Sequence, residues 1–131
     1  MLVRLAVAAF LLAHAGIHAG FVSSRPAATA GGPPWPFDLG RSWALSNLGI
    51  DPEVGRLVGV ALVALTFAGF ALAALTSVGI VPAAIGPAAI VVGAVASIGV
   101  LSLFFHPWLV VGLAIDLALL WGVVAGSLPW R

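Results

Sequence analysis

Long apolar runs separated by short joints dominate the pattern of hydrophobic and polar positions along this chain. A helix needs about 20 mainly apolar residues to cross a bilayer, and four runs reach that length, at about 2–22, 54–75, 83–105 and 108–128. The last three are joined by so few residues that they must be antiparallel neighbours. The pattern therefore predicts an all-α fold, namely a four-transmembrane-helix antiparallel bundle forming a single domain over residues 1–131.

The one long connection, residues 23–51, combines a Pro-, Gly- and Ala-rich stretch with aromatic side chains. Trp35, Phe37 and Trp43 are expected to anchor it at headgroup depth, because aromatic rings with an apolar body favour the membrane interface. We interpret residues 23–51 as an interfacial anchoring loop, and a lid over the bundle is the alternative.

Two helix starts are predicted within and after this loop. A short helix over 39–48 would be capped by Asp38. The second span would begin at Asp51-Pro52-Glu53, because Asp is a good cap and proline suits the first helical position.

Composition places the protein in a membrane and excludes several chemistries. Of the 131 residues, 63% are hydrophobic and 7% charged, whereas soluble domains carry roughly 25% charged residues. The chain has no Cys, Lys or Tyr, which excludes disulfides, thiolate metal sites and lysine Schiff bases. With a net charge of +1 and no basic run, we expect the lipid bilayer as partner and no nucleic acid.

Orientation is predicted from the charges that flank the first span. Arg4 and the amino terminus outweigh Arg25, so we expect both termini to be cytoplasmic, because the first span usually dominates. The alternative places the loop inside, because the loop and its flank carry Arg25, Arg41 and Arg56 against Arg4 and Arg131 on the other side. Arg4, the apolar run and Ala28-Thr29-Ala30 also resemble a signal peptide, although two histidines within the run argue against that alternative.

Small residues recur at four-residue spacing within the spans. Such residues let membrane helices approach closely, so we interpret them as packing positions inside this bundle, with a homodimer as the alternative. They are Gly16/Gly20, Gly55/Gly59, Ala89/Gly93/Ser97 and Gly122/Gly126.

Four ionisable residues within or beside the spans are predicted to form a buried polar cluster: His14, His18, His106 and Asp116. With a rise of about 1.5 Å per residue, His14 lies roughly 12 Å below one end of the first span and Asp116 about 13 Å below the same surface. His18 and His106 would share a shallower depth. The span hydroxyls, Ser97, Ser102, Thr66 and Thr76, are expected to bond to carbonyls one turn earlier.

Three interpretations of the cluster stay open, because burial of ionisable groups in a membrane is expensive and usually functional. The side chains could brace the helices. His14, His18 and His106 could instead bind a divalent metal or a haem. Asp116 and His14 could handle a proton.

The chain resembles a group of small, uncharacterised four-helix bacterial membrane proteins. The resemblance rests on His14-Ala15-Gly16-Ile17-His18 in the first span, Pro34-Trp35 in the loop and Gly112-Leu113-Ala114-Ile115-Asp116 in the last span. It implies the fold and an integral location in the cell membrane, and it implies no activity.

These observations lead to one function hypothesis with two alternatives. The leading hypothesis is a non-enzymatic accessory or structural subunit of a membrane complex, with other membrane subunits or a second copy as partners. The alternatives are a metal- or haem-binding electron- or ion-transfer subunit, and a proton-coupled carrier or membrane enzyme for a lipid-soluble substrate.

Overall fold

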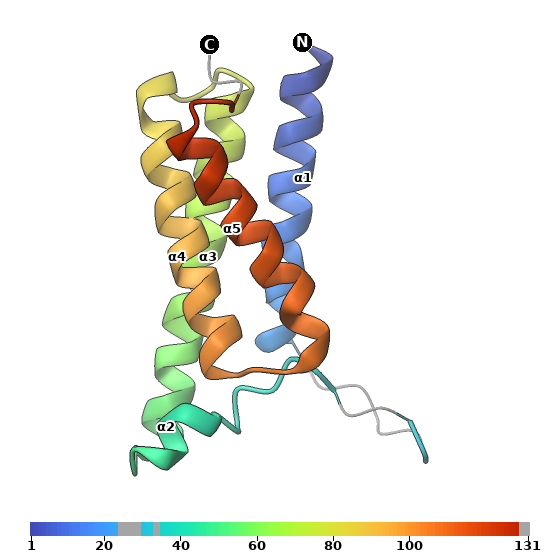
Figure 1. Ribbon diagram of the computed structural model, residues 1–131, viewed down its shortest axis with the longest axis vertical. Helices are drawn as coiled ribbons and strands as arrows, with labels where there is room; N and C mark the ends of the chain where they lie inside the picture. Colours follow the sequence, from blue (N-terminus) through green and yellow to red (C-terminus); the bar gives the residue numbers. More distant parts are fainter. Residues whose placement is uncertain (24–29, 33–34, 129–131) are drawn as a thin grey trace.

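The computed structural model describes residues 1–23, 30–32 and 35–128, and every regular element in these ranges is helical. Four long apolar helical segments could each cross a membrane, as expected from the sequence (Figure 1). They are α1 (Leu2–His18) with the 3₁₀ turn η1 (Ala19–Phe21), α3 (Pro52–Ser77), α4 (Gly86–Leu103) preceded by η2 (Ala83–Ile85), and α5 (Val110–Val124) preceded by η3 (Pro107–Leu109). The prediction of an all-α four-helix fold is confirmed, with boundaries that shift by a few residues.

The centre of the bundle is the α3–α4 pair. These two helices make the most extensive contact, α1 packs on α3 and α5 packs on α4, whereas α1 and α5 contact each other sparsely. A Cβ atom added to Gly69 would lie 2.5 Å from the backbone nitrogen of Gly93. The α3 and α4 backbones therefore meet directly, which explains why Gly93 belongs to a small-residue stripe.

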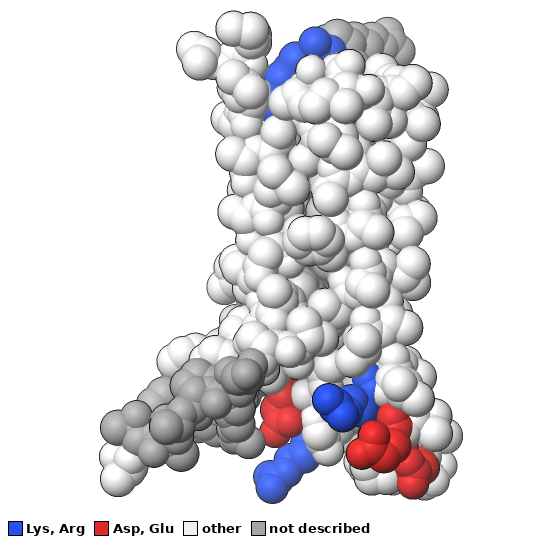
Figure 2. All heavy atoms as spheres, turned by 180° about the vertical axis from the view of Figure 1, so that it is seen from behind, with Lys and Arg blue, Asp and Glu red and all other residues white. Residues whose placement is uncertain are grey.

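The bundle has two polar ends and an uncharged middle. The amino terminus and the end of α5 lie at one end, and α2 and the α4–α5 turn lie at the other (Figure 1). On the face shown in Figure 2, the charged side chains gather at the two ends and the surface between them carries none. This arrangement supports a membrane protein with the amino terminus and the end of α5 on one side, and which side is cytoplasmic stays a prediction.

The long connection contains a shorter helix than expected, α2 (Trp43–Asn47). Its N-cap is Ser42, whose hydroxyl accepts from the backbone nitrogen of Leu45, so the prediction of a helix capped by Asp38 is wrong. Asp38 instead accepts from the backbone nitrogen of Gly40 at 2.8 Å. In this local turn, the Asp38 carboxylate accepts from the backbone two residues later. The helix therefore begins further along the chain, at Trp43.

The aromatic side chains of the connection attach it to the loop end of the bundle. The Phe37 ring packs edge-on against Phe21, with centroids 5.2 Å apart, and Trp35 packs edge-on against Phe37. Trp43 is 61% exposed, and its indole N–H donates to the carbonyl of Ser102 at 2.7 Å. Their position at a membrane interface stays a prediction, and Pro33 and Pro34 lie outside the described residues.

Candidate functional site

A hydrogen-bonded network of four side chains joins three helices in the interior of the bundle. His14 and His18 come from α1, Ser97 from α4 and Asp116 from α5. His14 Nε2 lies 2.9 Å from Oδ1 of Asp116, and the hydroxyl oxygen of Ser97 lies 2.5 Å from Oδ2 of Asp116. His18 Nε2 lies 2.8 Å from Ser97 Oγ. We call these four residues the polar network.

Helix geometry explains how the chain brings these groups together. His14 and His18 are four residues apart and share one face of α1. Ser97 lies one turn after Gly93 on the packing face of α4. Exposed fractions of 3% for His14, 2% for His18 and 0% for Ser97 and Asp116 show that the side chains of the network are buried.

One ring nitrogen in the network has an assigned proton. Nδ1 of His18 lies 3.0 Å from the carbonyl oxygen of His14, and a carbonyl can only accept. His18 therefore carries a proton on Nδ1, and a neutral His18 has an unprotonated Nε2 facing Ser97. This constraint comes from the backbone of α1 itself.

The expected contact between His14 and Asp116 is present, at 2.9 Å. It follows from the common depth of the two residues in helices that run in opposite directions. Hydroxyls in helices usually bond to a carbonyl one turn earlier, and for Ser97 that expectation is wrong, because its hydroxyl contacts His18 and Asp116. The hydroxyls of Thr66 and Thr76 do donate to carbonyls one turn earlier, those of Leu62 and Leu72. By the helical rise, Ser97 lies about 12 Å before residue 105, where the third span is predicted to end, so it shares the depth predicted for His14 and Asp116. That shared depth could have identified Ser97 from the sequence.

His106 does not join the polar network. It is the N-cap of η3 in the α4–α5 turn, is partly exposed, and its Nδ1 accepts from the backbone nitrogen of Trp108 at 3.3 Å. Its turn position, with a proline directly after it, directs its ring to local capping. The prediction of a buried cluster that includes His106 is corrected to a network that contains Ser97 instead.

The three-histidine metal site is likewise not assembled. In the described part of the chain, no group of three or more His, Cys, Asp or Glu side chains is arranged to hold a metal ion. Each histidine has a ring nitrogen in a protein hydrogen bond: Nε2 of His14, Nδ1 of His18 and Nδ1 of His106.

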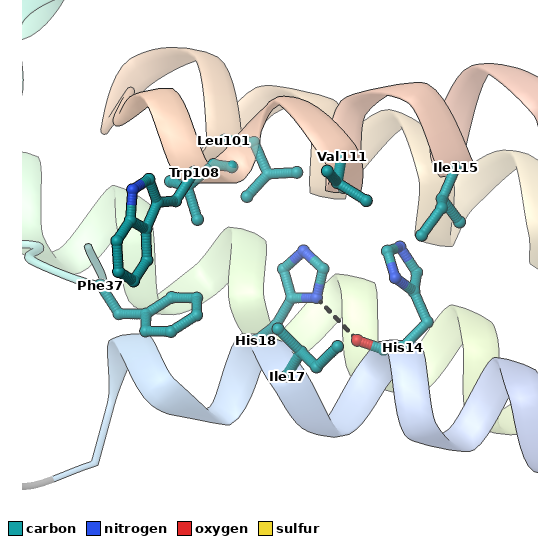
Figure 3. A pocket seen from close by; sticks show the side chains of 10 residues that line it. His14, Ile17, His18, Phe37, Leu101, Trp108, Val111 and Ile115 are labelled. Atoms are coloured by element: carbon teal, nitrogen blue, oxygen red, sulfur yellow. Dashed lines mark hydrogen bonds between the residues drawn. The ribbon is translucent and has the colours of Figure 1, made fainter.

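A cavity of about 140 Å³ lies between α1 and α5, beside the polar network. His14 and His18 project from α1 into this space, and Val111 and Ile115 face them from α5 (Figure 3). Ile17 and Val111 also line it although they are 55% and 68% exposed. The mouth of the cavity therefore reaches the outer surface of the bundle, where α1 and α5 separate. The remaining lining comes from Phe37, Leu101, Trp108, Leu109 and Gly112.

His14 presents a second ring nitrogen that the network does not use. Its Nε2 contacts Asp116, and among the described residues no hydrogen bond is formed by its Nδ1. If Nε2 carries the proton, as a contact with a carboxylate favours, Nδ1 of neutral His14 is an acceptor. The arrangement matches a general base in which a carboxylate orients an imidazole.

No family model, curated protein or solved structure matches this chain. Membership of the bacterial group that the sequence resembles therefore stays a prediction.

Proposed function

We propose that this membrane protein binds a small lipid-soluble molecule in the cavity between α1 and α5. The observation that carries the proposal is the composition of the cavity wall, which is apolar except for the two histidines of the polar network. This corresponds to the third hypothesis from the sequence, a carrier or membrane enzyme for a lipid-soluble substrate. A reaction is not part of the proposal.

Volume limits what the cavity can take. An apolar protein cavity of about 150 Å³ binds benzene, so a cavity of about 140 Å³ accommodates one six-membered ring. A longer tail could extend through the mouth beside Ile17 and Val111 into lipid. Nδ1 of His14 offers an acceptor, so a ring that carries a hydroxyl group fits better than a purely apolar ring.

The proposal can be tested with two ring compounds of nearly equal size. Phenol carries a hydroxyl where toluene carries a methyl group. We expect phenol to move the Nδ1 resonance of His14 in ¹⁵N-histidine-labelled protein in lipid nanodiscs, and toluene to move it much less. The substitution Val111→Trp should abolish the phenol effect because it fills the mouth of the cavity.

Val110→Trp is the matched control, because Val110 is also exposed, at 50%, but does not line the cavity. It should leave the phenol response unchanged. A His14 resonance that ignores phenol, or a response that survives Val111→Trp, would contradict a ligand site at this position.

A second candidate is the leading hypothesis from the sequence, an accessory or structural subunit with a buried brace. The observation in its favour is that the polar network ties α1 to α4 and α5, although α1 and α5 pack sparsely against each other. Purification from native membranes in mild detergent distinguishes the two candidates. Stoichiometric co-purification of another membrane subunit, together with no phenol response, would favour the accessory subunit.

A further inference from the structure

We infer that the polar network binds a proton inside the membrane span, which Asp116 and His18 share through the hydroxyl of Ser97. The inference rests on counting donors and acceptors at the contacts of these side chains. It does not depend on a ligand in the neighbouring cavity.

The count starts from His18, whose Nδ1 must donate to the carbonyl of His14. A neutral His18 can then only accept at Nε2, and the neighbouring atom is Oγ of Ser97 at 2.8 Å. A His18 that donates at Nε2 as well is an imidazolium.

Ser97 has one hydroxyl proton and two close polar partners. If it donates to Asp116, Nε2 of His18 must supply the proton for the other contact, so His18 is an imidazolium. If it donates to His18, Oδ2 of Asp116 must carry a proton and donate to Ser97. Both contacts are hydrogen bonds only when Asp116 is protonated, His18 is charged, or both.

The tautomer of His14 does not change this result. In the two simplest forms, His14 Nε2 donates to Oδ1 of Asp116 and the network as a whole has no net charge. An ionised Asp116 with two neutral imidazoles would instead place one uncompensated negative charge at a fully buried position in a span. It would also leave two lone pairs facing each other at one of the two contacts of Ser97. Both consequences are unfavourable where no water can compensate.

Two forms of the network have no net charge: one has a protonated Asp116 and a neutral His18, and the other has an ionised Asp116 and a charged His18. They interconvert without any other reactant. The O–H bond of Asp116 breaks as an O–H bond forms at Ser97, and the original Ser97 O–H bond breaks as an N–H bond forms at His18. The carboxyl becomes a carboxylate and the imidazole becomes an imidazolium. Since His18 also lines the cavity, this exchange carries the proton from Asp116 to the cavity wall.

No other titratable side chain faces the network in the described helices. From α3, the Phe70 ring packs against His14 with centroids 5.2 Å apart, and Thr66 bonds to its own helix. The ionisable residues of α3, Glu53 and Arg56, lie in its first turns and are exposed. His106 is engaged in the α4–α5 turn, so the shared proton belongs to Asp116 and His18.

Infrared and ¹⁵N magnetic resonance spectra of the full-length protein in lipid bilayers test the inference. The double variant Asp38→Asn/Asp51→Asn makes Asp116 the only aspartate in the chain and does not alter the polar network. With ¹³C-labelled aspartate, we expect either the carbonyl band of a protonated carboxyl or, from ¹⁵N-histidine, imidazolium signals from both nitrogens of His18. An ionised Asp116 found together with a neutral His18 in the same sample would overturn the inference.

Two substitutions test the sharing itself. Asp116→Asn can form the same contacts with neutral imidazoles, because its amide donates to Ser97 and its oxygen accepts from His14. We therefore expect complete loss of the imidazolium or carboxyl signal in a folded protein. Ser97→Ala should uncouple the two groups, so that Asp116→Asn no longer changes the ¹⁵N signals of His18, whereas Ser102→Ala, on the same helix, should leave them coupled. A His18 signal that still responds to Asp116→Asn in Ser97→Ala would show that Ser97 does not link them.

Discussion

Asp116 is a fully buried carboxyl whose two oxygens have different partners. Oδ1 contacts His14 of α1, and Oδ2 contacts Ser97 of α4. Its Gly112 neighbour, one turn earlier, lines the adjacent cavity. Asp116 therefore connects α5 to two other helices at one point. Substitutions of Asp116 can separate the contribution of its hydrogen bonds to stability from the contribution of its charge.

Asp116→Asn and Asp116→Leu are expected to differ in stability. The amide of Asn replaces both hydrogen bonds, so we expect the free energy of unfolding to change by no more than about 1 kcal/mol. Leu leaves His14 and Ser97 buried without their partner, which costs roughly 1–3 kcal/mol. Interhelical hydrogen bonds in membranes average only about 0.6 kcal/mol, which places the loss towards the lower part of that range. Reversible unfolding in mixed detergent micelles measures both variants, and equal stability would contradict a bracing contribution.

For single residues, the sequence predicts a contact correctly where the helical rise alone determines which side chains lie at the same depth. His14 and Asp116 meet because antiparallel helices place them at the same depth. It failed for Ser97, whose hydroxyl chooses between its own backbone and a neighbouring helix according to the rotation of α4. It failed for His106 because the direction of a side chain in a tight turn depends on local backbone geometry.

At the scale of the elements, α3 and α4 form the rigid pair on which the outer helices pack. The close approach of Gly69 to the backbone of Gly93 leaves no room for a side chain. The apposed atoms belong to backbone, which cannot move aside as a flexible side chain can. The helix pair therefore has a fixed separation at this level.

Gly69→Ala should destabilise the bundle by about 1–3 kcal/mol, because the two helices must separate to admit the new methyl group. Gly16→Ala is the control, since a Cβ atom there meets nothing within 4 Å and alanine favours a helix. Unfolding of both variants by denaturing detergent gives the comparison. A Gly69→Ala protein as stable as Gly16→Ala would refute close α3–α4 contact.

The short helix α2 depends on one serine that makes two hydrogen bonds. Ser42 accepts from Leu45 and donates to the carbonyl of Leu103 at 2.7 Å. Ser42→Ala should lose about 0.5–2 kcal/mol of local stability, seen as faster hydrogen exchange at the Leu45 amide. Ser46→Ala, on the exposed side of α2, should leave that exchange unchanged. Equal exchange rates in the two variants would show that Ser42 is dispensable.

The spans themselves were predictable because length and hydropathy define them, and Asp51 caps α3 as expected. The start of α2 was not predictable in the same way. Asp38 and Ser42 are both good caps, and the choice follows from the turn that Asp38 forms with Gly40.

At the scale of the whole molecule, the uncharged surface between two polar ends defines how the bundle sits in a bilayer. The segment 30–32 belongs to the long connection at the loop end, and residues 125–128 follow α5 at the opposite end (Figure 1). Because the native chain has no Cys, single cysteines can report on each end.

Ala30→Cys and Ser127→Cys should label with a membrane-impermeant maleimide from opposite sides. Val95→Cys, which is 56% exposed in the middle of α4, should resist labelling from both sides because lipid covers it. Labelling in sealed vesicles of known orientation also determines which side is cytoplasmic. Labelling of Ala30→Cys and Ser127→Cys from one side would contradict four spans.

The separation of α1 from α5 at the cavity mouth has a consequence for affinity. Val111 and Ile17 open the cavity sideways at the level of the apolar surface, so an occupant arrives by lateral diffusion within the bilayer. Occupancy then follows the concentration of the molecule dissolved in lipid, which exceeds its aqueous concentration by the partition coefficient. A site with weak intrinsic affinity would therefore be filled at low aqueous concentrations, and its apparent dissociation constant would change with the amount of lipid in the assay.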